Sequence, residues 1–494
     1  MQLQFQKNKI PCLRLIQGET QSQEQTQEIK LSEGMPDVGR ILGAWGQLII
    51  RGKEWRSDAA LCSCGVMVWV LYAPEDGSQA QCVESWIPMS VKWNIPETEQ
   101  DGTLLCQGTV KAADARILSG RKLMIRTCVC MTAQAYIPDQ AEYYEAGEVP
   151  EDIRLRKRTY HPAIVAEAGE KAFMMDEELT LPGTVPVMEK LIRCSLQPEI
   201  TDQKVLGDKA VFRGNCLFHM LYRTAEGALT SWDTEIPFSQ YTELEREYGH
   251  QAQVEFSPFV TALETEMAEG GRIRLKAGLS GQYLLCDTPE ISVAEDAYSP
   301  FREVTLQTET VELPAVKQQK QTVWVEQTAP FGGTRCADGD ITVGCPRLLS
   351  RADQDIAELS GAFGVLYYDS EGQLQAGNVH YQQEEPVEDS GILWCMPKGR
   401  PQILPGMDSM ALKGELTLHQ ISPSAESVTM LAGLTVGEQT RKNPDRPSLI
   451  LKRPGQQDLW TLAKENGSTV EAIQQANHLQ GEPEAERMLL IPVL

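Results

Sequence analysis

Two pairs of cysteines are the side chains in this sequence whose spacing could hold a metal ion. Cys62 and Cys64 are separated by one residue, as are Cys128 and Cys130. On a β-strand, residues i and i+2 lie on one face, so each pair of thiolates could contact one zinc ion. A zinc site needs about four ligands, however, and no histidine lies near either pair. Cys62 and Cys64 share their strand parity with the valines of Val66–Val70, which places them on the same apolar face. We therefore interpret these thiols as core residues and expect no metal or cofactor.

Motifs of the common hydrolases and nucleotide-binding enzymes do not occur in the sequence. There is no Gly-x-Ser-x-Gly, His-Glu-x-x-His, Walker-type loop or helix-opening Gly-x-Gly-x-x-Gly. His219 lies on the polar parity of its strand, which predicts that it is exposed to solvent. The sequence thus predicts that the protein is not an enzyme. The histidines, all in unrelated contexts, are His161, His219, His250, His380, His419 and His478.

The charge balance is strongly acidic and argues against nucleic acid as a partner. The 494 residues include 69 acidic and 45 basic side chains, a formal net charge of −24. Such a chain repels polyphosphate, and no long basic stripe offsets the repulsion. The only dense basic run is Arg154–Arg158, which we interpret as a solvated linker segment.

Targeting and membrane signals are not recognisable. The amino-terminal thirty residues lack an apolar core with a cleavage site, and the longest apolar run is too short to span a bilayer. We therefore expect a cytosolic protein without a transmembrane segment. The thirteen cysteines are scattered and odd in number. In a reducing compartment they are most simply unpaired, buried side chains.

One short pattern, Leu-Tyr followed by four residues and Gly, occurs three times at intervals of 150 and 145 residues. The first two copies also share flanking residues: Leu31 matches Leu181 and Pro36 matches Pro186, each at an offset of 150. A common offset over such a length indicates duplication of a domain-sized unit. The third copy keeps the pattern but lacks the flanking prolines. The three copies are Leu71–Gly77, Leu221–Gly227 and Leu366–Gly372.

The residues before each pattern alternate between apolar and polar types. Phe212, Cys216 and Met220 share one parity, whereas Arg213 and Asn215 have the other. Period-two alternation predicts β-strands, and the glycine predicts a hairpin turn with positive φ. We also expect one helical turn in each of residues 35–45 and 185–194.

The predicted fold is mainly β, with tandem, sandwich- or barrel-like domains followed by a small module at the carboxyl end. The expected boundaries are 1–148, 149–300, 301–446 for a diverged third copy, and 447–494.

The last forty-eight residues change from strand to helix periodicity. Leu459, Leu462 and Ala463 are spaced as one helical face, and Gly467 is suited to end that helix. Val470 and Ile473 begin a second helix. Short strands are expected on either side, so that the order is strand, helix, helix, strand.

This module resembles the LysM domain. The matching dipeptides, in order, are Leu459-Trp460, Leu462-Ala463, Thr469-Val470 and Ala476-Asn477, followed by Leu490-Ile491-Pro492. The first loop, "GQQDLW", departs from the usual Gly-Asp-Thr-Leu-Trp by one extra residue. The resemblance implies a core of Leu459, Trp460, Ala463, Val470, Ile473, Leu490 and Ile491. Its loops and helix ends give as candidate partner-binding residues Gln457, Asp458, Asn466, Asn477 and His478.

The duplicated region resembles the SPOCS domain of sporulation proteins. The stretches that carry the resemblance are "LPGTVPVMEKLI", "GNCLFHMLYRTAEG" and "EIPFSQ" in the second copy. Tandem SPOCS domains before a LysM module are similar to the SipL-like family of coat-assembly proteins. That family implies a non-enzymatic scaffold in the mother cell, at the forespore surface, whose LysM module binds the coat morphogenetic ATPase and which meets other coat proteins.

Two alternatives remain open at this point. The chain could be a peptidoglycan- or glycan-binding LysM protein of the wall or cortex, which would require export. It could also be a hydrolase carried by a binding module, for which the sequence offers no catalytic constellation.

Overall fold

The computed structural model describes residues 1–98, 102–268, 271–351, 354–388, 391–439 and 447–494. Nearly all of the regular structure is β-strand, and the described residues include two short helices near the carboxyl terminus. The mainly β prediction is therefore confirmed. The predicted boundary after residue 446 falls at the edge of residues 440–446, which lie outside the described part.

A first body is built from two facing sheets. In one, β4 lies between β3 and β5; in the other, β7 lies between β2 and β6. Apolar side chains of both sheets, such as Val68, Ile87 and Ile125, form one buried cluster between them. The strands are β2 (Gln6–Lys30), β3 (Val38–Arg56), β4 (Ala59–Pro74), β5 (Gln81–Asn94), β6 (Thr103–Ser119) and β7 (Lys122–Glu145).

A second body repeats this order of pairing. Its first strand pairs with its last, and the last pairs with the one before it. Strand β10 doubles back at Gly207, which has φ 64°, so that the Thr201 hydroxyl donates to the Arg213 carbonyl (3.4 Å). The strands are β9 (Ile164–Thr180), β10 (Met188–Thr224), β11 (Leu229–Tyr248), β12 (Gln253–Ala268) and β13 (Arg272–Asp287).

A third body has the same pairing of first, last and penultimate strands, β15, β21 and β20. Its second sheet has β18 between β16 and β19, with β17 also paired to β18. The strands are β15 (Arg302–Ala329), β16 (Arg335–Val343), β17 (Arg347–Ser350), β18 (Asp355–Tyr368), β19 (Leu374–Val387), β20 (Ile392–Leu404) and β21 (Met410–Gln439).

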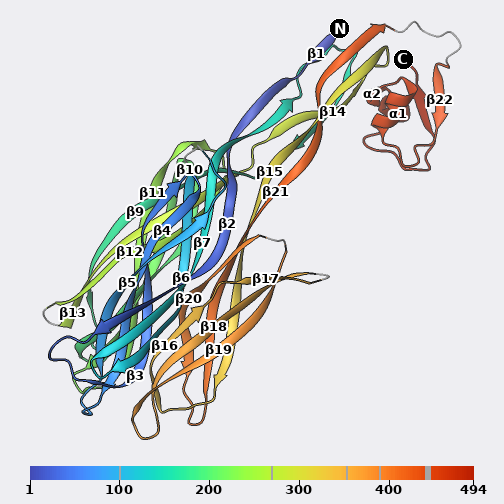
Figure 1. Ribbon diagram of the computed structural model, residues 1–494. Helices are drawn as coiled ribbons and strands as arrows, with labels where there is room; N and C mark the ends of the chain where they lie inside the picture. The colour runs from blue at the N-terminus through green and yellow to red at the C-terminus, as the bar shows by residue number, and fades with distance from the viewer. Residues whose placement is uncertain (99–101, 269–270, 352–353, 389–390, 440–446) are drawn as a thin grey trace.

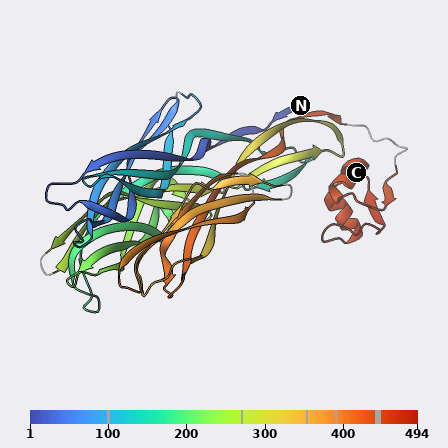
Figure 2. The same ribbon diagram turned by 60° about the horizontal axis from the view of Figure 1, so that its bottom comes forward.

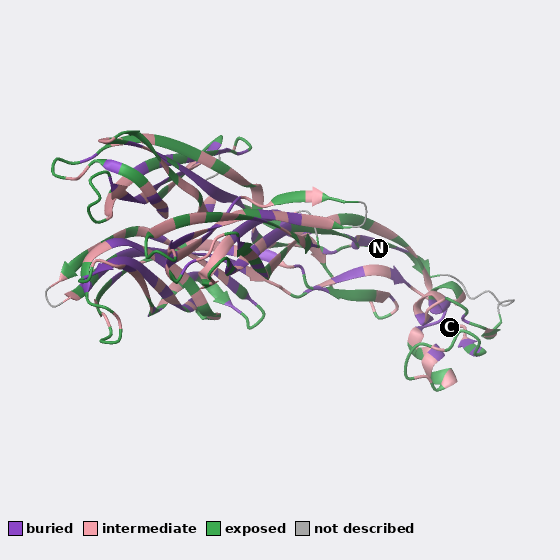
Figure 3. Ribbon diagram, turned by 90° about the horizontal axis from the view of Figure 1, so that it is seen from below, coloured by how far each residue is buried: buried purple, intermediate pink, exposed green. Residues whose placement is uncertain are grey.

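The three bodies lie side by side (Figure 2). In Figure 3 the buried residues lie along the strands, whereas the loops at the ends of the bodies are mostly exposed or intermediate. The first two share a six-stranded sheet through the single pair Leu13–Val165.

A ribbon of long strands extends from the bodies toward the termini (Figure 1). It includes β1 (Gln2–Gln4), which pairs with β21, and the antiparallel pair β8 (Arg154–Tyr160) and β14 (Ile291–Tyr298). Phe5, Ile153, Ala297 and Leu434 belong to the apolar cluster that holds these strands together.

The recurrent Leu-Tyr pattern has a structural explanation. The Tyr72 hydroxyl donates to the Pro36 carbonyl (3.0 Å), and the Tyr222 hydroxyl donates to the Pro186 carbonyl (3.1 Å). In the third body Tyr367 instead stacks on a phenyl ring, at a centroid separation of 5.1 Å. The preceding leucines of all three bodies meet in one buried cluster: Leu71, Leu221 and Leu366.

The structure confirms the predicted turn glycines but not the predicted helical turns. Gly77, Gly227 and Gly372 all have positive φ, between 73° and 89°, as the hairpin pattern predicted. The helical turns expected at 35–45 and 185–194 are wrong, because both segments run into long strands. In β10 the consecutive residues Ile192, Arg193 and Cys194 are all buried, so the strand is covered on both faces at this point.

Candidate partner-binding surface

The carboxyl-terminal unit contains β22 (Leu449–Lys452), α1 (Leu459–Asn466), α2 (Val470–Asn477) and β23 (Leu489–Pro492). The two strands pair antiparallel. Asp458 caps α1 by accepting from the Thr461 amide (2.9 Å), and Thr469 caps α2 through the Ala472 amide (3.1 Å). Each side chain satisfies a helix-end donor that has no intrahelical acceptor, which makes these short helices possible.

The core of this unit contains most of the residues expected there. Leu459, Leu462, Ala463, Ile473, Leu489 and Ile491 are buried together, and Val470 packs beside them partly buried.

One core assignment needs correction. Leu490 is 36% exposed, because alternation in β23 turns Leu489 and Ile491 inward and Leu490 outward. Trp460, like Val470, is partly buried and packs against the core.

The five candidate partner-binding residues make contacts within the unit or with the ribbon. The Gln457 amide donates to Glu465 (3.0 Å) and the Asn466 amide to the Leu462 carbonyl (2.6 Å). Asn477 joins α2 to β23, since its amide donates to the Leu490 carbonyl (2.6 Å) and its oxygen accepts from the Leu490 amide (2.7 Å).

His478 ends α2 in the left-handed region, with φ 52°. Asp458 additionally pairs with Arg156 of β8 at 2.9 Å. The hydrogen bonds from Thr461 and the charge of Arg156 lower the pKa of the Asp458 carboxyl. A role of these five residues in binding a partner stays a prediction.

The unit docks onto the end of the ribbon through α1. The Trp460 indole donates to Asp296 Oδ2 (2.8 Å), and the Lys464 ammonium lies 2.6 Å from Asp296 Oδ1. Tyr298 contacts the Trp460 ring edge to face, at a centroid separation of 4.8 Å, and joins the core of the unit. The face of α1 that carries Asp458 and Trp460 is therefore turned toward β8 and β14.

The basic run at 154–158 is a strand and not the linker segment expected from its composition. It forms most of β8, pairs with β14, and supplies Arg156 to Asp458 and Arg154 to Glu471 (3.9 Å). Its positive charge is thus matched to acidic residues of the carboxyl-terminal unit, about 300 residues later in the chain, which composition alone does not reveal.

Two of the cysteines form a disulfide, which the sequence did not predict. Cys130 of β7 forms a disulfide with Cys345, whereas all thirteen cysteines were expected to be unpaired. Cys62 and Cys64 are buried as expected; a hydrogen bond with Cys106 raises the pKa of Cys62, and one with Cys62 raises that of Cys64. Raised thiol pKa values disfavour the thiolate that metal binding requires. Within the described residues, no group of three or more His, Cys, Asp or Glu side chains is placed to hold a metal ion.

A buried charged cluster lies where the second and third bodies meet. Asp338 of β16 accepts from Arg193 of β10 (2.5 Å to Nη2) and from Arg400 of β20 (2.7 Å). His219 Nε2 lies 3.2 Å from Asp338, and its Nδ1 lies 2.5 Å from Asp233. His219 is 2% exposed, so the prediction that it is solvated is wrong. The side chain of His219 does point out of the second body, but the third body covers it there, so it does not reach water.

Electrostatics keep the centre of this cluster charged. Burial alone would raise the pKa of Asp338, but its interactions with Arg193, His219 and Arg400 lower it well below its ordinary range.

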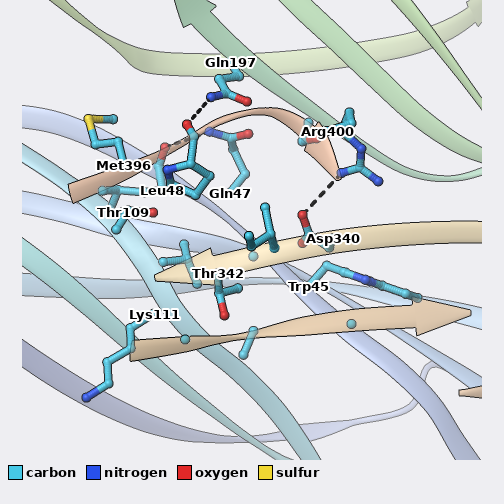
Figure 4. Close-up of a pocket in the computed structure, with 18 of the residues that line it drawn as sticks. Trp45, Gln47, Leu48, Thr109, Lys111, Gln197, Asp340, Thr342, Met396 and Arg400 are labelled. Carbon is cyan, nitrogen blue, oxygen red and sulfur yellow. Dashed lines mark hydrogen bonds and ion pairs between the residues drawn. The ribbon is translucent and has the colours of Figure 1, made fainter. Parts of the chain in front are cut away.

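A cavity of about 1160 Å³ adjoins this cluster and is lined by all three bodies (Figure 4). Several of its polar side chains join strands across it: the Gln197 amide donates to the Pro397 carbonyl (2.5 Å), and Gln47 accepts from the Leu196 amide (3.0 Å). Arg400 lies 3.3 Å from Asp340 in the same wall. The two glutamine contacts join neighbouring bodies, and the Arg400–Asp340 pair lies within the third.

The comparisons with known proteins give one match. A family model described as SipL, SPOCS domain, covers residues 188–268, which correspond to β10, β11 and β12. No curated protein and no solved structure matches the chain. The segment 188–268 is therefore similar to the SPOCS domain of SipL. Among the described residues, the helices are too short and polar to cross a membrane.

Proposed function

We propose that this protein is a non-enzymatic scaffold for spore-coat assembly, active in the cytoplasm of the mother cell at the forespore surface. The match to the SPOCS domain of SipL supports the sporulation role. The observation that carries the scaffold role is the separation of parts. Three interlocked β bodies form one end, and a small helical unit stands at the other end of the ribbon (Figure 1).

The three bodies are assigned as tandem SPOCS-like domains at 1–148, 149–300 and 301–446. The recurring order of strand pairing supports this assignment, as do the matching Tyr72–Pro36 and Tyr222–Pro186 hydrogen bonds. The loss of that bond at Tyr367 is in keeping with a diverged third copy.

The unit at 447–494 is assigned as a LysM-like module that binds the coat morphogenetic ATPase. Its order of strand, helix, helix and strand supports the assignment, together with the buried positions of Leu459, Ala463, Ile473 and Ile491. A module without enzymatic groups of its own would act as the adaptor that ties the β bodies and further coat proteins to the ATPase surface.

The function is tested by capture of the purified ATPase encoded in the same genome. Ile473→Asp in the full chain places a charge in the core of the module and should abolish capture. Gln475→Asp, which adds the same charge at an exposed position of α2, should leave capture unchanged. Equal capture by both variants and the parent chain would refute the assignment.

Binding of peptidoglycan or another glycan is the alternative. It ranks second because Asp458 and Trp460, beside the first loop of the module, contact Arg156 and Asp296 of the ribbon. Sedimentation with purified peptidoglycan distinguishes the two. Tight retention that Ile473→Asp abolishes, without any capture of the ATPase, would favour the glycan.

A further inference from the structure

A covalent bond joins two of the three β bodies. Cys130 of β7 belongs to the first body, and its partner Cys345 follows β16 in the third. Their Cα atoms lie 5.4 Å apart, within the range that a disulfide spans, although 215 residues separate them in the sequence. The bond therefore closes a loop that contains the whole second body.

The direction of the Cys130 side chain places this bond in the contact between the bodies. The preceding residue, Val129, is buried in the core of the first body. Because side chains alternate along a strand, Cys130 points out of that core, toward the third body. Nearby, the Thr20 hydroxyl lies 2.8 Å from that of Thr132 in β7 and donates to the Leu393 carbonyl of the third body (2.6 Å).

The first and third bodies also meet without the disulfide. Besides the bond from Thr20 to Leu393, Arg40 of β3 donates to the Leu374 carbonyl (2.9 Å). Leu105 of the first body and Trp394 of the third belong to one buried apolar cluster. These contacts do not depend on the oxidation state of the cysteines. The disulfide is thus a restraint added to an interface that other groups already form.

The surroundings of Cys345 favour thiol–disulfide exchange at this residue. Cys345 is half-buried, whereas Cys130 is 4% exposed. Lys111 is left unpaired by a shift in the register of β6, and a methyl group at Gly344 would lie 3.3 Å from its Cε. A nearby positive charge favours the thiolate, which is the attacking form of a cysteine. Cys345 is therefore the more accessible thiol of the pair, and the residue before it lies against a cation.

The expected compartment bears on when the bond exists. Disulfides are rare in the cytosol, because the thiol pool there keeps cysteines reduced. Under the proposed function the chain assembles in that compartment. The other eleven cysteines, all within the described residues, are unpaired. A bond between Cys130 and Cys345 then describes one of two states of the chain, and two thiols describe the other.

We propose that Cys130 and Cys345 form a redox-controlled clasp, which is open as two thiols during assembly and closes as a disulfide when the surrounding thiol pool becomes oxidised. The closed clasp fixes the first body to the third. This inference rests on the proposed function only for the reducing compartment. The chemistry of the pair does not depend on what the carboxyl-terminal unit binds.

The oxidant is a low-molecular-weight disulfide, for which oxidised glutathione is the probe. The Cys345 thiolate attacks one sulfur of this molecule, which forms a mixed disulfide and releases one glutathione thiol. The Cys130 thiolate then attacks the Cys345 sulfur and releases the second. Two protein thiols are oxidised, one small disulfide is reduced, and the two protons end on the released thiols. Excess reduced glutathione reverses both steps.

The test places the purified full chain in glutathione buffers of different redox ratio, traps free thiols with N-ethylmaleimide and maps the cysteines by mass spectrometry. Oxidised buffer should give a linked pair of peptides containing Cys130 and Cys345. Excess reduced glutathione should leave both cysteines alkylated, while circular dichroism shows that the chain remains folded. A pair that never links, or a bond that survives this reduction, would overturn the proposal.

Substitutions then separate the clasp from the other cysteines. Oxidation should raise the melting temperature of the parent bodies by about 2–5 °C, because a cross-link over a long loop restricts the unfolded chain. Cys130→Ser and Cys345→Ser should each lose this shift. Cys128→Ser is the matched control, since Cys128 is buried and unpaired on the same strand, and it should keep both the shift and the linked pair. An equal shift in Cys130→Ser and the parent chain would refute the clasp.

Alkylation of intact sporulating cells distinguishes the clasp from the proposed function. Both thiols should be alkylated during coat assembly, and the linked pair should appear in mature spores. If the pair is already linked during assembly although the chain captures the ATPase, the clasp is refuted and the scaffold role stands. If the purified chain links and opens as expected but captures no ATPase, the clasp stands and the proposed function fails.

Discussion

Two junctions in the molecule are each held by an aspartate that pairs with basic side chains. One joins the second and third bodies, and the other joins the ribbon to the carboxyl-terminal unit. The two ion pairs differ in how deeply they are buried. At the first, Asp338 has a side chain that is 1% exposed and receives two arginines. At the second, Asp296 is 23% exposed, and its partner Lys464 is 41% exposed. A buried ion pair is costly to break because the remaining charge has no water, whereas an exposed pair contributes little.

The contrast separates a permanent joint from a reversible one. Around Asp338, Arg193 and Arg400 come from different bodies, and the leucines of all three bodies pack nearby. The carboxyl-terminal unit has its own core and touches the ribbon mainly through α1. We therefore expect the bodies to unfold together, and the unit to detach without unfolding.

The largest effect is expected from Asp338→Ala, which tests whether the buried ion pair stabilises the bodies more than an exposed one would. Removing the carboxylate takes from the buried Arg193 its closest partner and leaves Asp340 at 3.9 Å, and we expect a loss of about 3–5 kcal/mol in the free energy of unfolding of the bodies. Denaturant unfolding followed by circular dichroism measures the change. Asp340→Ala is the matched control, because that side chain is 29% exposed and should cost about 0–1 kcal/mol. Similar losses in the two variants would contradict a special role for burial.

A smaller loss in the free energy of unfolding is expected at acidic pH, because His419 of the third body is buried. The Trp394 ring stacks on this imidazole at 4.9 Å, and burial, assisted by Lys320, lowers the pKa of His419 to about 3. The unfolded chain binds this proton near pH 6.5, so stability falls as the pH decreases from 6.5 toward 3. At about 1.36 kcal/mol per unit, the loss at pH 4.5 would reach at most about 3 kcal/mol.

The histidine contribution is isolated by comparing unfolding at pH 7 and pH 4.5. His419→Gln should remove most of the pH dependence, whereas His380→Gln, at an exposed site, should not. The contribution of Asp338 is separate. Its folded pKa is lowered, so its stabilisation is lost only as the pH falls below about 4, the ordinary value for Asp. An unchanged pH dependence in His419→Gln would refute the assignment.

Within the bodies, the tyrosine hydroxyls provide a finer comparison. Tyr222→Phe removes the bond to the Pro186 carbonyl and should cost about 0.5–1.5 kcal/mol. Tyr367→Phe should cost less, because Tyr367 packs by stacking on Phe331 rather than through a corresponding bond. Thermal unfolding of both variants gives the comparison. A larger loss at Tyr367 would argue that the third body relies on its hydroxyl after all.

The sequence predicts most strands correctly, but it misplaces where some of them begin. Period-two alternation correctly indicates the strand before Tyr222, and the three pattern glycines correctly indicate turns. The same alternation does not reveal that β10 continues back to Met188, because residues 185–194 also have helical spacing. Long strands bury both faces in places here, and a window of ten residues does not show which neighbour will cover the second face.

The contacts that join the parts are the least predictable from sequence. His219 has polar parity, but its partner Asp338 is 119 residues away, so its burial depends on how two bodies meet. The pairing of Arg156 with Asp458 spans an even longer separation. Leu490 was placed in the core by its position in a motif, whereas the register of β23 points it outward. Each of these features depends on tertiary arrangement rather than on local pattern.

The smallest effect expected is at the docking of the carboxyl-terminal unit. Asp296→Ala removes the acceptor for the Trp460 indole and the partner of Lys464, and an exposed pair of this kind contributes about 0–1 kcal/mol. We expect a larger maximum dimension in X-ray scattering and faster hydrogen exchange where Tyr298 meets α1. Sodium chloride at about 1 M, where the screening length is near 3 Å, should have the same effect on the parent chain.

Glu471→Ala is the control for this change, since its carboxylate lies 3.9 Å from Arg154 and is largely exposed. Protection of the amides around Ile473 should persist in every variant, because the unit retains its own core after it detaches. If Asp296→Ala and high salt leave the scattering curve unchanged, the joint is as permanent as the one at Asp338. The depth of the ion pair would then not distinguish the two junctions, and the apolar contact of Tyr298 would have to account for docking.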